Sequence, residues 1–371
     1  MVENKKKKIS VVGIVGLPAN YGGFETLTEQ MVTYLGDDYN FRVFCSSTAY
    51  LDQQKTFLSA NLEYIPLSAN GVRSILYDTW GLLKCLRGKQ VVLLLGVSAG
   101  LFLPVFRLLS RNRLVVNIDG LEWRREKWGK FARWFLKISE WAAVRMAHEI
   151  VTDNEVIHEY IKNEYDRESH LIEYGGDHAK NSPKELPARA YDALPNTVPF
   201  DENYAMTVCR IEPENNVGLI LEAFCNESLM PLVFIGNWQA SEYGQDLLRK
   251  YGKCPNIHMV NPIFDIEIIN WLRANCSAYL HGHSAGGTNP SLVEAMWAGA
   301  PVLSYDVNFN RVTTENKSAY FSTPEEIMTI IKSHSSERIE QLKKDLSEIA
   351  GRRYTWKRIC SLYQTIFQQC N

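Results

Sequence analysis

The sequence predicts an α/β protein with two doubly wound, Rossmann-like domains. Short continuous apolar runs alternate with segments of helical periodicity, as expected of parallel strands that helices cover on both faces. At 371 residues, the chain is long enough for two domains with separate cores. A stretch with four prolines and no clear period, 183–200, is the best linker candidate. We therefore expect domains over 1–182 and 201–351, followed by a terminal helix within 352–371.

The composition is that of an ordinary globular protein. Apolar residues make up 46% and charged residues 22%, and a net charge of −2 argues against a dedicated nucleic-acid-binding protein. Eight scattered cysteines include no CxxC pair, which favours core packing in a reducing compartment over disulfides or zinc sites. No secretory signal pattern and no run of 18 uncharged apolar residues occurs. We therefore expect a cytosolic protein without a membrane span.

The first predicted strand leads into a glycine-rich loop. Residues 9–15 form an apolar run, and the loop GLPANYGGF, 16–24, separates it from a helical pattern over 25–35. A strand, a loop with adjacent glycines and a helix are also the parts of a dinucleotide-binding unit. The glycines do not give GxGxxG, however, and the next strand does not end in an acidic residue. The loop alone is therefore weak evidence for a ligand.

Two further apolar runs, 91–95 and 114–118, are predicted as parallel strands that are covered on both faces. The second run ends directly before Asp119. Ligands of doubly wound sheets bind beyond the carboxyl ends of the strands, so Asp119 lies where chemistry is expected.

The segment 123–145 combines aromatic and basic residues. It holds four of the nine Trp, and seven Lys or Arg against two Glu. The residues expected to face the core, at helical spacing, are Phe131, Phe135, Ile138 and Ala142. The residues expected to form a membrane-surface face are Trp128, Arg133, Trp134 and Lys137. Trp and cationic side chains suit the headgroup region of a bilayer. The alternative is an amphipathic core helix with a solvated basic face.

The stretch with the most functional information is HGHSAGGTNPSLVEAMWAG, residues 281–299. An apolar run before it is predicted as a strand, and 290–298 as a helix with Pro290 in its first turn. Adjacent glycines let the backbone approach a ligand, and the amides that open the helix can hold an anion. Glu294, one turn further in, suits a sugar hydroxyl. The pattern fits a nucleotide-linked sugar, and the alternative is an ordinary strand–loop–helix in which Asn289 caps the helix.

This stretch resembles the donor-binding signature of retaining glycosyltransferases of the GT4 type, which have the GT-B fold. The matching parts are Leu292-Val293-Glu294-Ala295-Met296 and Gly299-Ala300-Pro301-Val302. Where the family usually has an earlier Glu, this chain has Gly286, so contacts to the transferred sugar are expected from His283, Thr288 or Asn289. The resemblance implies two domains that face a cleft, and a C-terminal helix that crosses back to the first domain.

The resemblance extends to two other parts of the second domain. After the predicted strand 204–208, Arg210 has the position of an arginine directed at the donor diphosphate, while Asn215 stands where a lysine is usual. Arginine contacts phosphate in two places, so Arg210 alone can still anchor it. Because Asn215 replaces that lysine, one positive charge that would neutralise phosphate is absent. The apolar segment around Ile263 lies where such enzymes hold the base of the nucleotide.

Two strings of the first domain, GLPANYGGFET and DGLEWRREKW, resemble a GT4 subgroup in which rhamnosyltransferases of surface polysaccharide assembly are prominent. The first string points toward the cleft in that fold, which makes Gly22, Gly23 and Glu25 candidates for the donor diphosphate or the acceptor. The second string begins at Asp119, near the place where many relatives have a His close to the reacting sugar. Glu122 follows three residues later.

The implied donor-binding residues are Gly22, Gly23, Arg210, Asn215, Ile263, His283, Gly286, Gly287, Thr288, Asn289, Pro290, Ser291, Leu292 and Glu294. The implied acceptor-binding residues are Glu25, Asp119 and Glu122, and the implied catalytic residues are Asp119, Arg210 and Glu294. No Asp-x-Asp occurs, and the alternate residues His281 and His283 lack further zinc ligands at suitable spacing. Neither a metal nor another cofactor is therefore expected.

The resemblance implies a retaining transfer of L-rhamnose from dTDP-L-rhamnose to an undecaprenyl-diphosphate-linked sugar, in O-antigen or capsule assembly. Segment 123–145 is then expected to hold the protein peripherally on the cytoplasmic face of a bacterial inner membrane. One alternative is a GT4-type transferase with another hexose donor, a UDP- or GDP-sugar. Alternatives of another class are a UDP-sugar 2-epimerase and a non-catalytic nucleotide-sugar-binding protein.

Overall fold

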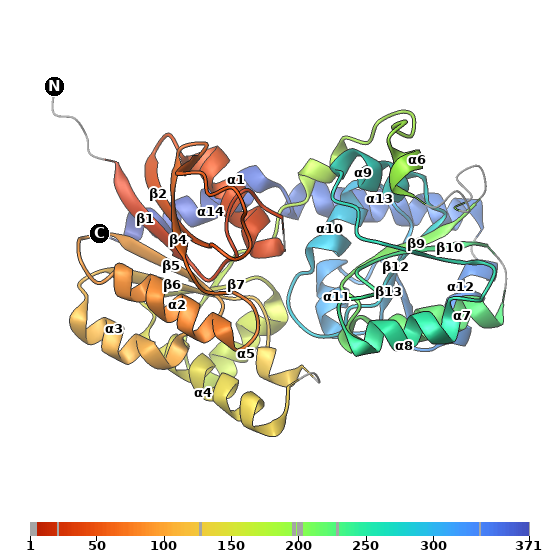
Figure 1. The fold of residues 1–371 in the computed structure, drawn as a ribbon. Coiled ribbons are helices and arrows are strands. Elements are labelled where there is room, and N and C mark those ends of the chain that lie inside the picture. The colour runs from red at the N-terminus through yellow and green to blue at the C-terminus, as the bar shows by residue number, and fades with distance from the viewer. Residues whose placement is uncertain are drawn as a thin grey trace. The chain divides into compact units, whose positions relative to one another are not determined.

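A computed structural model describes residues 6–20, 22–125, 128–194, 198, 203–227, 230–333 and 335–370. The chain divides into two compact units (Figure 1). Unit 1 comprises Met1–Arg124, Trp128–Tyr174 and Trp356–Asn371, and unit 2 comprises Arg125–Lys127 and Gly175–Thr355. The predicted linker includes residues 195–197 and 199–200, which lie outside the described residues, so the predicted domain bounds stay a prediction.

Within its described residues, unit 1 contains an eight-stranded sheet of order β3-β4-β2-β1-β5-β6-β7-β8. The strands, in this order, are Thr56–Phe57, Ala60–Ile65, Tyr39–Ser46, Lys7–Val12, Val91–Leu95, Arg113–Ile118, Glu149–Thr152 and His170–Leu171. All neighbours pair in parallel except β3 and β4. The central strand β5 is apolar and buried along its whole length, as the run at 91–95 predicted.

The helices of unit 1 cover both faces of this sheet. They are α1 (Gly23–Leu35), α2 (Arg73–Lys84), η1 (Gly100–Phe102), α3 (Leu103–Leu109), η2 (Glu122–Arg124), α4 (Lys130–Met146), α5 (Glu155–Tyr165) and α14 (Trp356–Gln369). The strand order changes direction at β1, and right-handed crossovers therefore place α1 on one face and α2, α3 and α4 on the other. Figure 1 shows α14 beside α1 on the first of these faces.

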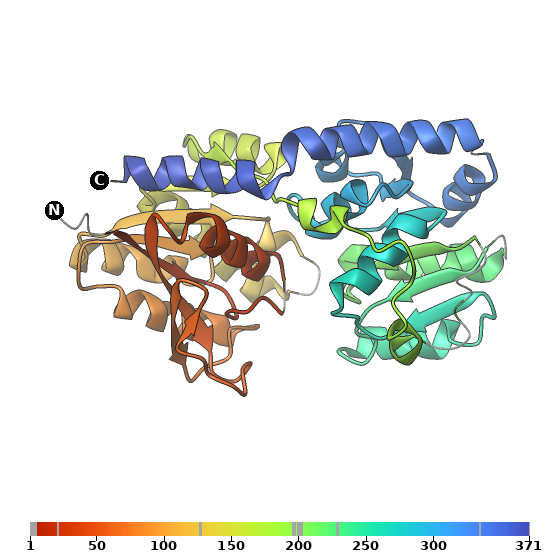
Figure 2. The same cartoon turned by 90° about the horizontal axis from the view of Figure 1, so that it is seen from above.

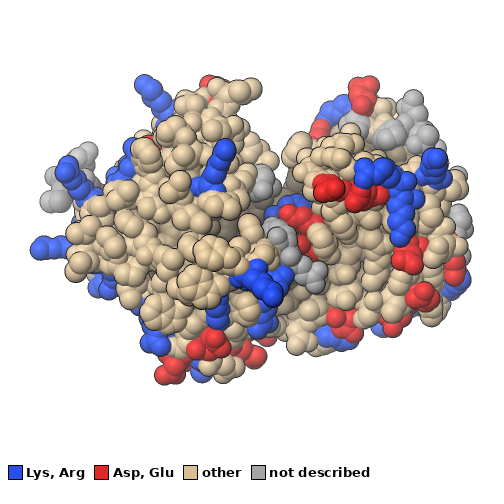
Figure 3. Space-filling model, turned by 60° about the horizontal axis from the view of Figure 1, so that its bottom comes forward, with Lys and Arg blue, Asp and Glu red and all other residues tan. Residues whose placement is uncertain are grey.

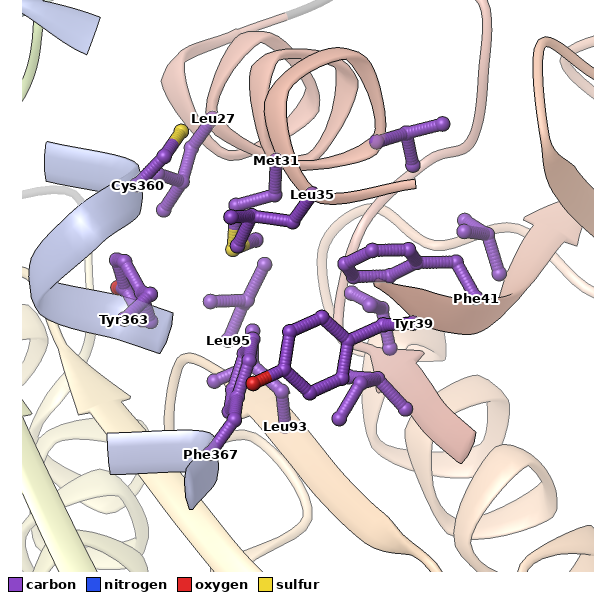
Figure 4. Close-up of a cluster of buried hydrophobic side chains, with 14 of the residues drawn as sticks. Leu27, Met31, Leu35, Tyr39, Phe41, Leu93, Leu95, Cys360, Tyr363 and Phe367 are labelled. Carbon is purple, nitrogen blue, oxygen red and sulfur yellow. The ribbon is translucent and has the colours of Figure 1, made fainter. Parts of the chain in front are cut away.

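The C-terminal helix completes the core of unit 1. Figure 2 shows α14 running along unit 1, and Figure 4 shows Tyr363 and Phe367 directed toward side chains of α1 and the sheet. Asn117 Nδ2 donates a hydrogen bond of 2.6 Å to the Tyr363 hydroxyl, and the Phe367 ring lies 5.6 Å from that of Tyr39. The prediction that the terminal helix packs on the first domain is confirmed.

Within the described residues, unit 2 contains a six-stranded parallel sheet of order β11-β10-β9-β12-β13-β14. The strands, in this order, are Ile257–Val260, Leu232–Ile235, Ala205–Val208, Ala278–His281, Val302–Tyr305 and Ala319–Phe321. The helices are η3 (Asp177–Lys180), α6 (Ala190–Ala193), η4 (Pro213–Asn215), α7 (Val217–Asn226), α8 (Glu242–Tyr251), α9 (Ile266–Asn275), α10 (Pro290–Trp297), α11 (Asn308–Thr313), α12 (Pro324–Ser333) and α13 (Ser336–Arg353). Both sheets are Rossmann-like, which confirms the predicted fold class.

The predicted first strand, 9–15, is too long at its C-terminal end. The strand ends at Val12, because Gly13 has φ +101° and a Cβ there would lie 2.1 Å from the Leu95 carbonyl oxygen. Only glycine fits this close approach between two neighbouring strands. Residues 13–15 therefore belong to the loop.

The predicted orientation of the segment 123–145 is wrong in part. Phe131 was expected in the core but is 78% exposed, whereas the buried residues of α4 are Ser139, Glu140, Ala142, Ala143 and Val144. Lys137 was expected at a membrane surface, but its Nζ lies 2.9 Å from Glu164 and 4.8 Å from the Trp123 ring. Helix α4 has apolar residues both on the side that packs on unit 1 and on the side that faces solvent. Its periodicity alone therefore could not show which side is buried.

The prediction that core packing is favoured over disulfides is wrong for two of the eight cysteines. Cys225, at the end of α7, forms a disulfide with Cys254, which precedes β11, and the two Cα atoms are 5.5 Å apart. Asn256 Nδ2 donates to the Phe224 carbonyl oxygen at 2.5 Å beside this disulfide. No helix in the described part of the chain has the length and hydropathy needed to cross a bilayer.

Candidate nucleotide-sugar site

The sheet of unit 2 changes direction between β9 and β12. Connections run from β9 outward to β10 and β11, and then from β12 outward to β13 and β14. The carboxyl ends of β9 and β12 therefore form a topological switch point, where open α/β sheets bind their ligands. Arg210 lies in the loop after β9, and residues 282–289 form the loop after β12. The topology thus brings together two segments that the sequence predicts to bind the donor.

Hydrogen bonds join these two loops. The Ser284 backbone N–H donates to the Glu214 carbonyl at 2.8 Å, and Asn216 Nδ2 donates to the Gly282 carbonyl at 2.8 Å. A Cβ at Gly282 would lie 2.1 Å from the Asn215 carbonyl oxygen, so the close approach of the loops requires glycine there. The loop that carries Arg210 is therefore fixed on the loop that leads to α10.

Asn215, which stands where the resemblance implies a lysine, is buried between these loops. Its Nδ2 donates to the Arg210 carbonyl at 2.7 Å, and its Oδ1 lies 2.7 Å from His283 Nδ1. An amide oxygen can only accept, so His283 Nδ1 is the donor in this contact. Both ends of the Asn215 amide are thus engaged within the protein. We expect Asn215 to position the Arg210 loop and His283 instead of neutralising phosphate.

The two histidines at the end of β12 are uncharged at neutral pH. Burial lowers the pKa of His281 to about 3. Burial also lowers the pKa of His283 well below its ordinary value, and the nearby charge of Arg210 lowers it further. The buried His281 Nε2 has no hydrogen-bond partner among the described residues. No group of three or more His, Cys, Asp or Glu in the described residues is arranged to hold a metal.

The start of α10 is shaped for close approach. Gly286 has φ +128°, a backbone conformation that favours glycine, and Gly287 and Thr288 are buried. Asn289 Oδ1 accepts hydrogen bonds from the Ser291 backbone N–H at 3.0 Å and from its hydroxyl at 2.9 Å. Asn289 is therefore a helix cap, as the alternative interpretation of the sequence had it. A bound anion would meet the positive end of the helix dipole at this turn.

Glu294 lies within a network of charges. Its Oε1 is 3.1 Å from His178 Nε2, and its Oε2 forms an ion pair with Arg273 of α9. The Arg273 side chain is 3% exposed and that of Glu294 is 16% exposed. Burial alone would raise the pKa of Glu294, but Arg273 and His178 outweigh it and hold the pKa at about 2. Glu294 is therefore an ionised carboxylate that is held on two sides and retains some access to solvent.

The loop after β1 in unit 1 is fixed by acidic side chains of α1. Gly22 caps α1 and Gly23 is its first residue. Glu25, predicted to bind the acceptor, is buried, and its Oε1 accepts from the Val15 backbone N–H at 2.7 Å. Glu29 Oε2 accepts from the Ala19 N–H at 2.8 Å. Glu25 therefore braces this loop from inside, and a contact between its carboxylate and an acceptor stays a prediction.

Asp119 follows β6 in unit 1, at the carboxyl edge where ligands of such sheets bind. It is half-buried, and Glu122 begins the short helix η2. Burial raises the pKa of Tyr174 well above its usual value, and the neighbouring charge of Asp119 raises it further. Asp119 thus lies near the buried Tyr174 at the end of the sheet. Its catalytic role stays a prediction.

The comparisons with known proteins agree with this geometry. Residues 195–350 match the family described as glycosyl transferases group 1, and residues 6–177 match a domain of unknown function, DUF1972. Sucrose-phosphate synthase from Thermosynechococcus elongatus is similar at 15% identity with a TM-score of 0.79, over 98% of this chain and 99% of that chain. HepE from Anabaena, in complex with UDP-glucose, gives 14% identity and a TM-score of 0.74 over 97% and 99%. The α,α-trehalose 6-phosphate synthase from Burkholderia multivorans gives 9% and 0.72 over 98% and 96%.

Residues 195–350 form a group 1 glycosyltransferase domain, and the fold of the chain is GT-B. A search of curated protein sequences finds no match. The solved structures, all below 25% identity, establish the fold of this transferase, and the group 1 match lies on the part that contains Arg210 and Glu294. The predicted rhamnosyltransferase subgroup is not part of what these matches establish.

Sequence reasoning missed the two residues that contact Glu294, Arg273 and His178. Arg273 lies on α9 among the buried residues Ile269, Leu272 and Cys276. The one signal in the sequence is that Arg273 lies within an apolar helical pattern. A buried arginine requires an acidic partner, because an isolated buried charge is costly. Nothing in the sequence indicated that this partner is Glu294, which lies on another helix.

Proposed function

We propose that this transferase moves a hexose from a nucleoside-diphosphate sugar to a hydroxyl group with retention of configuration. The observation that carries the proposal is the combination at the switch point of unit 2. Arg210, the start of α10 and the ionised Glu294 are presented by elements at the carboxyl ends of β9 and β12. Cations and helix amides suit a diphosphate, and a carboxylate suits a ribose diol.

The diphosphate end of the donor is assigned to Arg210 and the loop 286–289. The leaving diphosphate gains negative charge as the glycosidic bond breaks, and fixed positive groups stabilise that charge. Arg210 has a guanidinium that contacts phosphate oxygens in two places, which compensates for the lysine that Asn215 replaces. Gly286 leaves space for the backbone to approach, at the position where the family resemblance implies a Glu side chain.

The ribose end is assigned to Glu294. A carboxylate has about four lone-pair positions. The contacts to His178 and Arg273 use one position on each oxygen, which leaves others for ribose hydroxyls. Because its pKa is about 2, Glu294 accepts hydrogen bonds throughout the physiological range. The apolar segment at Ile263, which packs against the core of unit 2, is assigned to the base.

The finer proposal is transfer of L-rhamnose from dTDP-L-rhamnose to an undecaprenyl-diphosphate-linked sugar, in O-antigen or capsule assembly. It is supported by the strings GLPANYGGFET and DGLEWRREKW. We assign Asp119 and Glu122 to the acceptor side, with Asp119 orienting the acceptor or stabilising the oxocarbenium-like sugar. The donor phosphate accepts the acceptor's proton, so no protein base is required. Peripheral contact of 123–145 with the inner membrane belongs to the same proposal.

A UDP-hexose is the second candidate donor, because HepE was solved with UDP-glucose. The test is a panel of dTDP-, UDP- and GDP-sugars with purified protein, in thermal shift and then in transfer to a short-chain lipid-diphosphate sugar. A bound donor raises the melting temperature by mass action, so the preferred donor stands out at equal concentration. Transfer from dTDP-rhamnose alone supports the finer proposal, and preference for a UDP- or GDP-sugar replaces rhamnose. Interconversion of free sugar nucleotide indicates an epimerase, and binding without turnover indicates a non-catalytic protein.

Two variants separate donor binding from chemistry. Arg210→Ala should weaken donor binding and transfer together, whereas the control Arg249→Ala, which removes an exposed arginine paired with Asp246, should change neither. Asp119→Asn should lower turnover far more than donor affinity. Wild-type turnover in Asp119→Asn would contradict the catalytic assignment.

A further inference from the structure

Unit 1 has one face on which three successive helices each expose an apolar stripe. The stripe of α2 consists of Val72, Leu76, Trp80 and Leu83. The stripe of η1 and α3 consists of Leu101, Val105, Leu108 and Leu109, and that of α4 consists of Phe131, Trp134 and Trp141. Spacings of three, four and seven residues place the members of each stripe on one side of their helix.

The three stripes belong to one continuous layer. The helices α2, α3 and α4 cover the same face of the sheet (Figure 1). Near the start of α2, the Ser74 and Ser98 hydroxyl oxygens are 3.2 Å apart, and Ser139 Oγ of α4 donates to the Val97 carbonyl at 2.7 Å. A Cβ at Gly100 would lie 1.9 Å from the Ser139 carbonyl oxygen, so η1 and α4 are in direct contact. The exposed stripes are therefore held side by side.

The segment from the middle of α2 to the end of β6 carries charges of one sign, although Lys84 within it is paired with Glu63 of β4. Residues 79–118 contain no Asp or Glu, and their cations are Lys84, Arg87, Lys89, Arg107, Arg111 and Arg113. Within α4 the only acidic residue is Glu140, which is buried and accepts hydrogen bonds from the Tyr160 and Tyr165 hydroxyls. In Figure 3 the forward face of unit 1 is mostly free of charged side chains, with Lys and Arg at its margins and some Asp and Glu at its lower edge.

We propose that these three stripes together form a docking face for an anionic lipid bilayer, with α2 and α3 taking part as well as α4. Apolar side chains surrounded by cations match the acyl and headgroup levels of such a bilayer. A second copy of the chain would bring the same cations against this face and would be repelled. The inference extends the membrane contact proposed above from one helix to three, and it depends on neither donor nor acceptor.

Co-sedimentation with vesicles tests the docking face. The wild-type protein should bind phosphatidylcholine vesicles that contain phosphatidylglycerol, with little binding to pure phosphatidylcholine and loss of binding in high salt. The variants Leu76→Glu, Leu108→Glu and Phe131→Glu each alter one helix at a residue that is at least 63% exposed. Each should lower the vesicle partition coefficient by roughly tenfold or more, because an apolar side chain is replaced by an anion. Leu51→Glu, a fully exposed leucine outside the stripes, is the matched control and should bind as wild type.

Four results would overturn the inference. These are equal binding of the wild type to neutral vesicles, no binding to anionic vesicles, loss in Phe131→Glu alone, and equal loss in the Leu51→Glu control. Sedimentation velocity identifies the alternative occupant: a wild-type dimer that Leu108→Glu converts to a monomer, without vesicle binding, indicates a second copy. Circular dichroism and melting temperature show whether each variant is folded. Transfer to a soluble acceptor without vesicle binding would refute the docking face and leave the proposed transfer intact.

Discussion

The surroundings of Glu294 in unit 2 and the exposed face of α2, α3 and α4 in unit 1 depart in opposite ways from the usual distribution of side chains. In unit 2 a carboxylate and an arginine are buried together, whereas in unit 1 leucine, phenylalanine and tryptophan side chains face solvent. Charged groups are rarely buried without a partner, and large exposed apolar areas mark binding surfaces. A buried, oriented charge suits a small polar ligand, and an exposed apolar face suits an extended one. The two departures therefore indicate two different kinds of ligand.

The largest expected effect is on the buried pair. Arg273→Met leaves Glu294 as a mostly buried carboxylate with only His178 beside it, and should lower the free energy of unfolding by about 3–5 kcal/mol. Urea unfolding at neutral pH measures this. Arg249→Met, which breaks an exposed pair with Asp246, is the control and should cost less than about 1 kcal/mol. If both substitutions lowered the free energy of unfolding by the same amount, the buried pair of Arg273 and Glu294 would contribute no more to stability than an exposed pair.

The same pair gives a pH dependence. The pKa of Glu294 is about 2 in the folded protein and about 4.3 in an unfolded chain. A depressed folded pKa contributes stability above the unfolded pKa, and that contribution is lost as pH falls from about 4 to about 2. In Arg273→Met this loss should shrink or reverse, because burial then raises the folded pKa of Glu294 toward or above the unfolded value, and protonation removes a poorly paired buried charge. Urea midpoints at closely spaced acidic pH values measure the difference, and superimposable profiles would contradict the assignment.

A smaller effect is expected where the exposed face is anchored. Gly100→Ala places a methyl group against the Ser139 carbonyl and should force η1 and α4 apart, at a cost of about 1–3 kcal/mol. Gly129→Ala, directly before α4, places a methyl group with no other atom within 4 Å and serves as the control. Urea unfolding compares them. If Gly100→Ala keeps full stability, the contact between η1 and α4 is not what holds the stripes together.

The smallest effect is expected on the exposed face itself. Leu108 is 86% exposed, so Leu108→Glu should change the free energy of unfolding by less than about 0.5 kcal/mol. Unchanged stability together with a large loss of vesicle binding would show that Leu108 contributes to binding and not to folding. A loss of stability comparable to that of Gly100→Ala would instead assign Leu108 to the core.

The sequence predicted what depends on local pattern. Buried strands such as 91–95, the helix start at Pro290 and the position of Arg210 after a strand all follow from apolar runs and turn residues. The site residues as a set remain predictions, since only bound ligand or activity can test them. What failed depends on contacts between distant segments. Whether Phe131 faces sheet or solvent depends on how α4 sits on the sheet, and that is not encoded in its own periodicity.

The same limit explains the pairs that were missed. Arg273 meets Glu294, and Cys225 meets Cys254, because separate helices and loops of unit 2 pack together. Asn215 looked like the loss of a phosphate-binding charge, yet the structure shows an amide that joins two loops. A substitution within a family motif can thus replace a ligand contact by a structural one, and only the fold reveals which.

The place of α14 has a consequence for synthesis of the protein. Unit 1 requires Tyr363 and Phe367 for its core, whereas unit 2 ends at Thr355. On the ribosome, unit 2 therefore has all its residues before unit 1 does, although unit 1 begins the chain. Domains usually fold in N-terminal to C-terminal order during translation, and this chain should reverse that order. Limited proteolysis of ribosome-stalled nascent chains ending at residue 355 or 371, each followed by a tether that spans the exit tunnel, would show protection of unit 2 first. Protection of unit 1 in the shorter chain would contradict this.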